Sequence, residues 1–292
     1  MNDAVTELLI KHDLAQLESD VREFVLPCVG IDLVESEDDT EPVSKLGGNP
    51  YLPNNFAWPT NKTRPLELVL QVNLADVVEF DVWKQLPDRG LLTFFYDIEE
   101  QPWGFDPKDV AGFKVHYSPP ELPVHQRQSP ESEFKLPKRQ LRFRFSQSVP
   151  SVGSRSYERL TEIIRFSSDD EADRFFDGFG LDLAMSGSSY KRNHWGGKHR
   201  LLGHSDNVQG DMQLEAELVS NGLYAGDPSG YEDPRALELE SHADEWILLL
   251  QVDSDESIDL MWGDVGSIYY WIKREDLANR NFSNTWLVLQ CS

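Results

Sequence analysis

Two apolar runs of the same pattern decide the fold: LELVLQVNL at residues 66–74 and WILLLQVDS at residues 246–254. Each is followed downstream by a glycine-led aromatic run, GLLTFFY at 90–96 and GSIYYWI at 266–272. Short apolar runs rich in branched and aromatic side chains are typical of buried strands. The chain therefore has a β-rich core with two similar strand pairs.

The alignment of these segments also pairs individual polar residues. Gln71 falls over Gln251, and the glycine of one aromatic run falls over the glycine of the other. An ordered match of this kind indicates an internal repeat. It predicts two related β units, at about 44–150 and 197–292, that face one another across a pseudo-two-fold axis.

The other predicted elements surround these strands. Alternation of Leu141, Phe143 and Phe145 with polar residues predicts a half-buried strand at 140–147. A further strand is predicted at 113–118. Apolar side chains at three- and four-residue spacing predict helices at 4–25, 155–166 and 211–221.

Together these elements predict an α+β fold with a large pseudo-duplicated β-sheet core, peripheral helices and an N-terminal helix. We expect the N-terminal helix within residues 1–28 and a single α+β domain over 29–292. The Gly- and His-rich stretch at 180–210 has no clear period, so it predicts a long connecting or functional loop.

Charge is the most unusual property of the composition. The chain has 27 Lys and Arg against 51 Asp and Glu, a formal net charge of -24. Such a surface repels nucleic acid and attracts basic proteins or peptides, although it also serves solubility. No apolar run is long enough to span a bilayer, and the first residues mix acids and bases, so we expect a cytoplasmic protein.

Several of these segments resemble the YwqG-like family of bacterial proteins. The resemblance lies in SKLGGNPYLPNNFAWP, LVLQVNLADV, HRLLGHSDNVQGD, LLLQVDSD and MWGDVGSIYYWIKREDL, in this order from about residue 44 to the end. Two features depart from the family pattern: a polar insertion at 119–138, and His204 where an aromatic residue is expected. The resemblance implies a compact α+β fold and supplies no catalytic residues, since none are established for the family.

Motifs for metals and cofactors are weak. Asp253, Asp255, Asp259 and Asp264 take calcium-loop positions, but Ile258 stands where the sharp turn needs glycine. The histidines at 194, 199 and 204 lie five residues apart among glycines, which does not suit a helical zinc site. Neither a nucleophile elbow nor a phosphate-binding glycine loop is present. The sequence predicts no metal and no cofactor.

A local group of cations stands out in this acidic chain. Lys191, Arg192, Lys198 and Arg200 lie near Trp195, with no acid between Tyr190 and Ser205. This patch could bind an anion or an acidic segment, or it could neutralise the protein's own carboxylates.

Polar residues at matched strand ends predict where a ligand would lie. If two-fold symmetry relates the units, Gln71 and Gln251 could meet at a shared rim; alternatively, each glutamine bonds the backbone of a neighbouring loop. The pairs Trp103-Gly104 and Trp262-Gly263 either bring a ring to a binding surface or close the core. The predicted ligand-binding residues are Gln71, Asn73, Trp103, Asp106, His204, Gln251, Asp253, Trp262 and Asp264.

These observations favour a non-enzymatic binding protein for a basic protein partner. The alternative is a hydrolase with a cleft between the two β units, using dispersed polar residues such as Gln71, Asp106, Gln251 and Asp264. A pocket with several convergent carboxylates or histidines would favour the enzyme. The sequence leaves the catalytic residues and the oligomeric state open.

Overall fold

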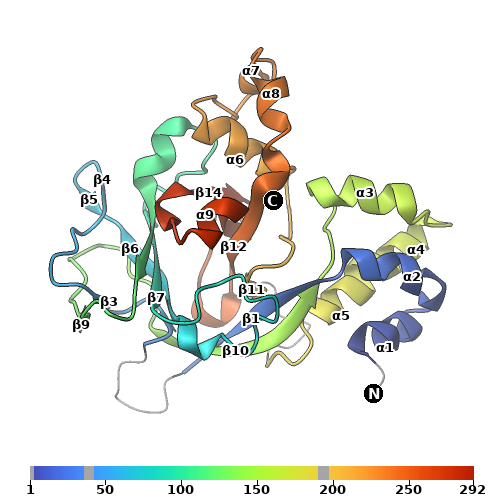
Figure 1. Cartoon of the computed structure of the whole chain (residues 1–292), viewed down its shortest axis with the longest axis horizontal. Coiled ribbons are helices and arrows are strands. Elements are labelled where there is room, and N and C mark those ends of the chain that lie inside the picture. Colours follow the sequence, from blue (N-terminus) through green and yellow to red (C-terminus); the bar gives the residue numbers. More distant parts are fainter. Residues whose placement is uncertain (1–2, 36–42, 190–196) are drawn as a thin grey trace.

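The computed structural model describes residues 3–35, 43–189 and 197–292, and its centre is a ten-stranded sheet (Figure 1). Neighbouring strands are antiparallel throughout. The strands are β1 (Leu26–Val34), β2 (Lys45–Leu46), β6 (Glu67–Asn73), β7 (Leu91–Tyr96), β8 (Phe113–Ser118), β10 (Arg139–Ser148), β11 (His199–Leu201), β12 (Trp246–Asp253), β13 (Ser267–Lys273) and β14 (Thr285–Gln290). With helices around this sheet, the prediction of an α+β fold with a large β-sheet core is confirmed.

The order of strands along the sheet is β14-β13-β12-β11-β1-β10-β2-β6-β7-β8. A three-stranded meander therefore lies at each end, a short strand precedes it, and the long antiparallel pair β1 and β10 joins the two groups. Each meander has a register shift just before its glutamine, between Leu68 and Leu70 in one and between Leu248 and Leu250 in the other. The repeated sequences therefore adopt corresponding positions in the two groups.

The main core lies where the two meanders face each other. The rings of Phe94 and Tyr270, which correspond in the alignment, contact edge to face with centroids 5.0 Å apart. The sheet also curls until its end strands meet, because Phe113 of β8 and Trp286 of β14 contact at 5.3 Å. The result is a sheet close to a barrel, filled by apolar side chains from both groups.

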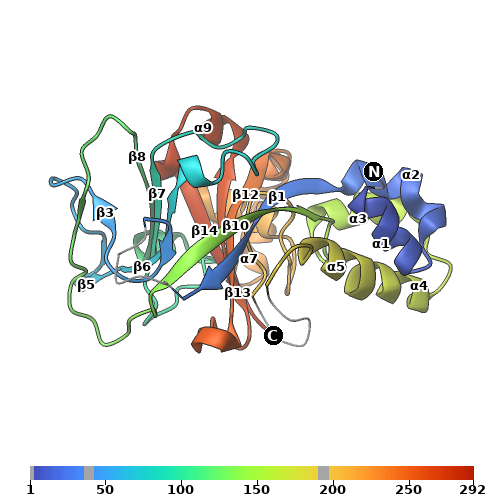
Figure 2. The ribbon, with the colours of Figure 1, turned by 90° about the horizontal axis from the view of Figure 1, so that it is seen from below.

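A helical lobe forms a second, separate core beside the sheet (Figure 2). It combines the N-terminal helices with the segment that follows β10. The elements from this segment are α3 (Arg155–Ile163), α4 (Asp169–Asp173), the π-helix η5 (Arg174–Gly180) and α5 (Leu181–Ala184). Leu9, Leu160, Phe175 and Phe179 are fully buried among them.

The N-terminal region differs from the single helix predicted over 4–25. It consists of α1 (Ala4–Lys11) and α2 (Glu18–Val21), and a short 3₁₀ turn lies directly before and directly after α2. The break lies at Asp13, whose backbone is left-handed with φ of 55°. A left-handed residue ends an α-helix, and the turn lets both halves bury their apolar residues in the lobe.

The stretch at 180–210, predicted as a loop, also contains regular structure. Its first residues form α5. Residues His199–Leu201 form β11, which lies between β1 and β12 in the sheet and pairs with both. Buried polar side chains in so short a strand gave no apolar pattern to recognise. Lys191, Arg192, His194 and Trp195 lie outside the described residues.

The remaining elements cover the ends of the sheet. They are α6 (Met212–Ser220), α7 (Pro228–Tyr231), α8 (Ala236–Glu240), α9 (Arg274–Ala278), and the strand pairs β3 (Tyr51–Leu52) with β9 (His125–Gln126) and β4 (Thr60–Asn61) with β5 (Arg64–Pro65). Among the residues described, none of the helices has the length and apolar character required to cross a membrane.

Candidate functional site

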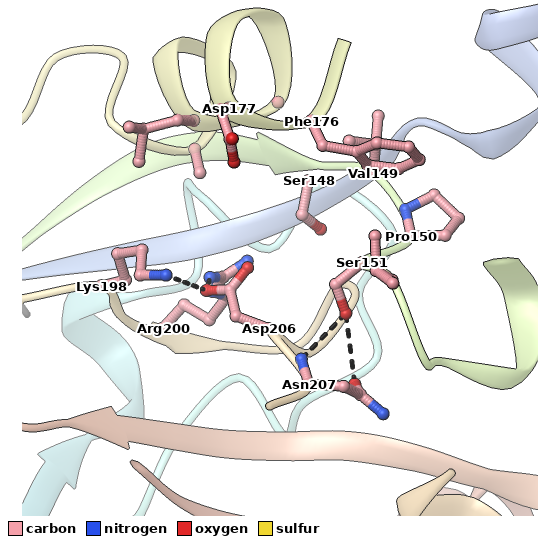
Figure 3. Close-up of a pocket in the computed structure, with 14 residues that line it drawn as sticks. Ser148, Val149, Pro150, Ser151, Phe176, Asp177, Lys198, Arg200, Asp206 and Asn207 are labelled. Atoms are coloured by element: carbon pink, nitrogen blue, oxygen red, sulfur yellow. Dashed lines mark hydrogen bonds and ion pairs between the residues drawn. The ribbon is translucent and has the colours of Figure 1, made fainter. Parts of the chain in front are cut away.

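A polar cavity of about 300 Å³ lies where the helical lobe meets the second strand group. Its walls come from the end of β10 and the residues after it, from η5 and α5, and from the residues flanking β11 (Figure 3). The lining residues are Ser148, Val149, Pro150, Ser151, Val152, Phe176, Asp177, Gly180, Leu181, Ala184, Lys198, Arg200, Asp206 and Asn207. This volume suits a small molecule.

Two cations occupy the floor of the cavity. The side chain of Arg200 is only 4% exposed and forms an ion pair with Asp206. Its guanidinium also donates to the carbonyl of His204 at 3.1 Å. The Nζ of Lys198 lies 3.6 Å from the same carboxylate, and burial lowers the pKa of this ammonium group. A buried charge persists only when it is paired, so Asp206 is the counter-ion of this floor.

Asp206 is itself held by the core of the second strand group. The side-chain amide of Gln251 donates to its carboxylate at 2.9 Å, and its backbone N–H donates to Gln251 Oε1 at 3.0 Å. Tyr269 donates its hydroxyl proton to the Asp206 carbonyl. These bonds fix the position of the floor carboxylate before any ligand arrives.

The opposite wall is the π-helix η5. Figure 3 shows Asp177 pointing from this helix toward the floor, with the ring of Phe176 at the other side of the cavity. A π-helix widens the turn and is frequent at functional sites. Gly180 belongs to the same wall, where an added Cβ would lie 3.1 Å from Val149.

Hydroxyl and amide groups form the third side. Ser151 Oγ donates to the Ser205 carbonyl and accepts from the Asn207 backbone N–H, both at 2.8 Å. Ser148 Oγ accepts from the His204 N–H at 2.8 Å. Since these hydroxyls are engaged in holding the loop, they position the wall and are not poised as nucleophiles.

The charges on the described walls of the cavity balance. Lys198 and Arg200 face Asp177 and Asp206, and none of the other described lining residues is charged. A ligand with one net charge would leave an unpaired charge in a partly buried site, whereas a neutral or zwitterionic ligand would not.

The structure does not bring Gln71 and Gln251 together. Gln71 bonds the backbone N–H and carbonyl of Tyr51 at 2.8 and 2.9 Å and the hydroxyl of Thr93 at 2.8 Å. Gln251 bonds Asp206 and the Lys198 carbonyl. The two sets share no residue, and four strands separate β6 from β12. Each glutamine therefore holds its own loop, and the shared rim is not formed.

Three of the predicted residues lie behind the walls of the cavity and hold residues that line it. Gln251 holds Asp206, as described above. His204 is buried, its Nε2 lies 2.9 Å from the Phe24 carbonyl, and burial lowers its pKa to about 4. Asp253 accepts from the Ser267 hydroxyl at 2.6 Å and from the Lys198 N–H at 3.1 Å. None of the three lines the cavity, but all position residues that do.

The tryptophan segments lie elsewhere. Trp262 is 1% exposed and packs on Tyr96 in the main core. The Trp103 carbonyl accepts from the Leu289 N–H at 2.9 Å, which ties its loop to β14. Both therefore have positions typical of core closure.

The remaining predicted residues are also distant from the cavity. Asp106 caps η4 (Pro107–Gly112) by accepting from the Lys108 N–H at 2.9 Å. Asp264 is exposed, and its carbonyl accepts from the Ser292 N–H at 3.1 Å. Asn73 caps the turn after β6 and lines a different, mainly apolar hollow. In the described residues, no three His, Cys, Asp or Glu side chains converge as a metal site.

Sequence reasoning found part of this site. Lys198 and Arg200 belong to the cationic patch noted in the sequence, and Asp206 lies in the LLGHSD segment. Asp177 and Phe176 were missed, because they lie in an apparently ordinary helical stretch and no local pattern distinguishes them. Only the packing of the lobe against β11 reveals their role.

Comparison with known proteins adds one result. Residues 44–291 match a family model described as a domain of unknown function, DUF1963. The matched span contains both meanders and every residue that lines the cavity, and it begins after β1. No curated protein matches the chain.

Proposed function

The chain belongs to the DUF1963 family of domains of unknown function, and we propose that it is a non-enzymatic binding protein whose cavity holds a small zwitterion. The YwqG-like assignment is the finer family placement that we propose. The observation that supports the function is the placement of a cation, Lys198, and a carboxylate, Asp177, on facing walls.

The ligand class follows from this arrangement. A molecule with both an ammonium group and a carboxylate, such as a free amino acid, would face Asp177 with one end and Lys198 with the other. Charge-assisted hydrogen bonds at both ends would favour it over a singly charged analogue. Phe176 provides an apolar surface beside them.

Binding is favoured over turnover by what lines the cavity. Neither a histidine nor a cysteine is among its described lining residues, and the Ser148 and Ser151 hydroxyls already bond the backbone of the loop after β11. The hydrolase alternative needs a cleft between the β units. In the described chain that interface is occupied by apolar side chains, such as Phe94 against Tyr270.

Calorimetric titration of the full chain with free amino acids of increasing size tests the proposal. Each should bind more tightly than its analogue lacking the amine or lacking the carboxylate, by about tenfold to 100-fold, since a hydrogen bond to a charged group contributes about 1.5–3 kcal/mol. Asp177→Asn and Lys198→Gln should each cause a similar loss.

The matched control is Lys108→Gln, at a side chain that is 91% exposed and distant from the cavity. It should leave the affinity unchanged. Equal binding of the single-charge analogues, or binding that is indifferent to Asp177→Asn and Lys198→Gln, would contradict the zwitterion site.

The basic protein partner predicted from the net charge has a candidate surface on α6, α7 and α8, which project from the sheet (Figure 1). Residues 211–245 contain ten acids and a single Lys or Arg, Arg235, which pairs with Asp233 at 3.0 Å. Glu217 is buried and pairs with Lys273, and burial raises the pKa of Glu215 to about 8. The other acids are Asp211, Asp227, Glu232, Asp233, Glu238, Glu240, Asp244 and Glu245. Leu237 is 82% exposed among them. An exposed apolar side chain within acidic surroundings complements a basic amphipathic segment.

A labelled peptide of Lys and Leu, with the Leu residues at three- and four-residue spacing so that they form one face of a helix, tests this second candidate by fluorescence anisotropy. Binding should weaken as salt rises, and Leu237→Ser should lower the affinity by about tenfold or more, since burial of a leucine contributes about 1.5 kcal/mol or more. The control is Ile10→Ser, at an isoleucine that is 56% exposed in the helical lobe. Equal loss in both variants would indicate attraction to the overall charge alone and would reject this surface.

A further inference from the structure

A second hollow of about 460 Å³ lies on a different part of the molecule, where the loop before β7 meets the start of β12 and helix α9. Its lining residues are Lys84, Gln85, Leu86, Pro87, Ile247, Arg274, Leu277, Ala278 and Arg280. It shares no residue with the cavity beside η5. Its chemistry therefore requires a separate explanation.

The described lining of this hollow contains three cations and no carboxylate. Lys84, Arg274 and Arg280 form no ion pair or side-chain hydrogen bond with any residue in the described ranges. The nearest acids in sequence are Asp81, Asp88, Glu275 and Asp276. Asp81 accepts from the Leu86 N–H at 2.7 Å, Asp276 is engaged with Asn281 and Asn284 at 2.8 and 2.9 Å, and none of the four acids lines the hollow.

Eight arginines in the described ranges contact carboxylates, namely Arg22, Arg64, Arg142, Arg144, Arg155, Arg174, Arg200 and Arg235. Arg274 and Arg280 do not, and together with Lys84 they are distinguished by lining one hollow that has no acid among its described lining residues. Like charges around one hollow repel each other, and a bound anion would offset that repulsion. An anion is therefore the complementary occupant.

The backbone at Lys84 supports the same conclusion. Lys84 and Arg280 both adopt left-handed conformations, with φ of 51° and 57°. Glycine or asparagine would adopt this conformation at lower cost, and a long cationic side chain there is a local strain of the kind that functional sites retain. Arg280 takes the left-handed position that ends α9, as Asp13 does after α1, so the strain that a functional role would explain is that of Lys84.

The rest of the lining defines the body of the ligand. Leu86 and Leu277 are buried, and Pro87, Ile247 and Ala278 complete an apolar floor. A phosphate monoester carries up to two negative charges and three acceptor oxygens, which suits several Lys and Arg donors better than a single carboxylate does. We propose that this hollow binds a small organic phosphate, with the phosphoryl group on the three cations and an apolar group on the floor.

Phenyl phosphate is a suitable probe for the full-length protein, with calorimetry at low salt as the readout. It should bind more tightly than inorganic phosphate, which lacks the apolar group, and more tightly than benzoate, which carries one charge. Arg274→Gln and Arg280→Gln should each weaken binding by roughly tenfold, as expected for loss of one charge-assisted bond. Binding should also weaken with added salt.

Lys84→Gly separates binding from folding. Because φ is positive at this residue, glycine should maintain or raise the midpoint of thermal unfolding, while the affinity for phenyl phosphate falls about tenfold. The matched control is Lys62→Gly, at another exposed lysine with a left-handed backbone, φ 56°, outside the hollow. It should have a similar effect on stability and none on binding.

Three results would overturn the proposal. One is no heat of binding for phenyl phosphate at millimolar concentration and low salt. Another is binding that none of the three substitutions alters. The third is binding of a phosphorylated peptide or of vesicles with anionic lipid while phenyl phosphate does not bind, since the hollow would then serve a macromolecular surface. None of these results depends on the zwitterion cavity, which can be tested on its own.

Discussion

The two loops that precede the glutamine strands, 44–51 and 199–206, share one construction. Each begins at a buried cation, Lys45 or Arg200. In each, a backbone N–H six residues later donates to the glutamine of the next strand: Tyr51 to Gln71 at 2.8 Å and Asp206 to Gln251 at 3.0 Å. The same turn is fixed by the same kind of bond in both strand groups.

The backbone between these points also corresponds. Gly47 and Gly48 have φ of 61° and 73°, and Leu202 and Gly203 have φ of 63° and 79°. Two successive left-handed residues are rare outside glycine. This detailed agreement supports our proposal that the two β units are related by an internal duplication.

The two loops differ in what covers them. In the first, the Lys45 ammonium lies 4.7 Å from the centre of the Tyr51 ring, and Phe56 and Trp58 pack beside the strand behind it. In the second loop, Asp206 stands at the position that Tyr51 has in the first. The helical lobe covers this loop, and the polar cavity lies between the lobe and the loop. One scaffold thus gives a closed loop in one unit and an open, charged site in the other.

Among the substitutions that test this comparison, one at Gly203 should change the free energy of unfolding most. An added Cβ would lie 2.6 Å from Ser148 Oγ and 2.7 Å from the Cβ of Cys28, at a positive φ. We expect Gly203→Ala to lower the free energy of unfolding by about 3–4 kcal/mol, from overpacking together with backbone strain. Urea unfolding measures it.

Gly222→Ala is the control for that experiment, because Gly222 also has a positive φ, 84°, but nothing lies within 4 Å of its added Cβ. It should cost only the strain, about 1 kcal/mol. Equal losses at the two glycines would mean that the close approach of Gly203 to Ser148 and Cys28 does not contribute to stability.

The paired variants Gln71→Leu and Gln251→Leu test the shared bond directly. Each leaves buried backbone groups of its loop unpaired, so each should lower the free energy of unfolding by about 2–3 kcal/mol. Only Gln251→Leu should also weaken ligand binding, because only Gln251 holds Asp206. If Gln71→Leu affects binding as strongly, the assignment of the site to the second unit is wrong.

Much of the fold could be predicted from the sequence, and these pairs explain why. Strands β6, β7, β12 and β13 are buried apolar runs, so their pattern is visible and their correspondence can be aligned. β11 could not be found, because it is three residues long, its His199 and Arg200 are buried polar side chains, and the partner of His199 is Asp255, which is distant in sequence. A local pattern carries no information about such partners.

The candidate site was predicted less well for the same reason. The importance of Gln251 was visible because the repeat marks it. Asp177 lies on the lobe, outside both repeats, and its approach to Lys198 depends on how two separate cores pack.

The alternation expected in β10 is wrong in part. Phe145 is 44% exposed and Ser146 is buried, because Ser146 bonds the Ala184 carbonyl of the lobe.

The pH dependence of stability should differ between the two loops, because His204 occupies the position that Asn49 has in the first. Burial lowers the folded-state pKa of His204 to about 4, with the Arg200 charge acting in the same direction. The unfolded chain therefore binds a proton between pH 6.5 and 4 that the folded chain does not, so stability falls as pH falls through this range. From pH 7 to pH 5 the loss is about 2 kcal/mol.

His204→Asn should remove that dependence, and the difference between variant and wild-type unfolding free energies measured across pH 7 to 5 checks it. Taking the difference cancels other groups, such as His116, whose pKa burial also lowers to about 4. His125→Asn, at an exposed histidine, is the control. Parallel pH profiles for wild type and His204→Asn would show that His204 takes up its proton over the same pH range in the folded protein as in the unfolded chain.

The smallest expected change in stability is also the one that best separates the two loops. Lys198 corresponds to Val43, a residue that lines a mainly apolar hollow in the first unit. Lys198→Val therefore gives the second loop the residue of the first.

Because the Lys198 side chain is 34% exposed and lies 3.6 Å from Asp206, solvent screening limits its contribution to stability. The free energy of unfolding should therefore change by less than about 1 kcal/mol. The affinity for a zwitterion should nevertheless fall by about tenfold or more, since one of its two charges loses its partner. The thermal midpoint and the calorimetric affinity of the same preparation give both values. A large loss of stability with unchanged affinity would reverse the interpretation: Lys198 would then be a structural counterpart of Lys45, and the cavity would have no binding role.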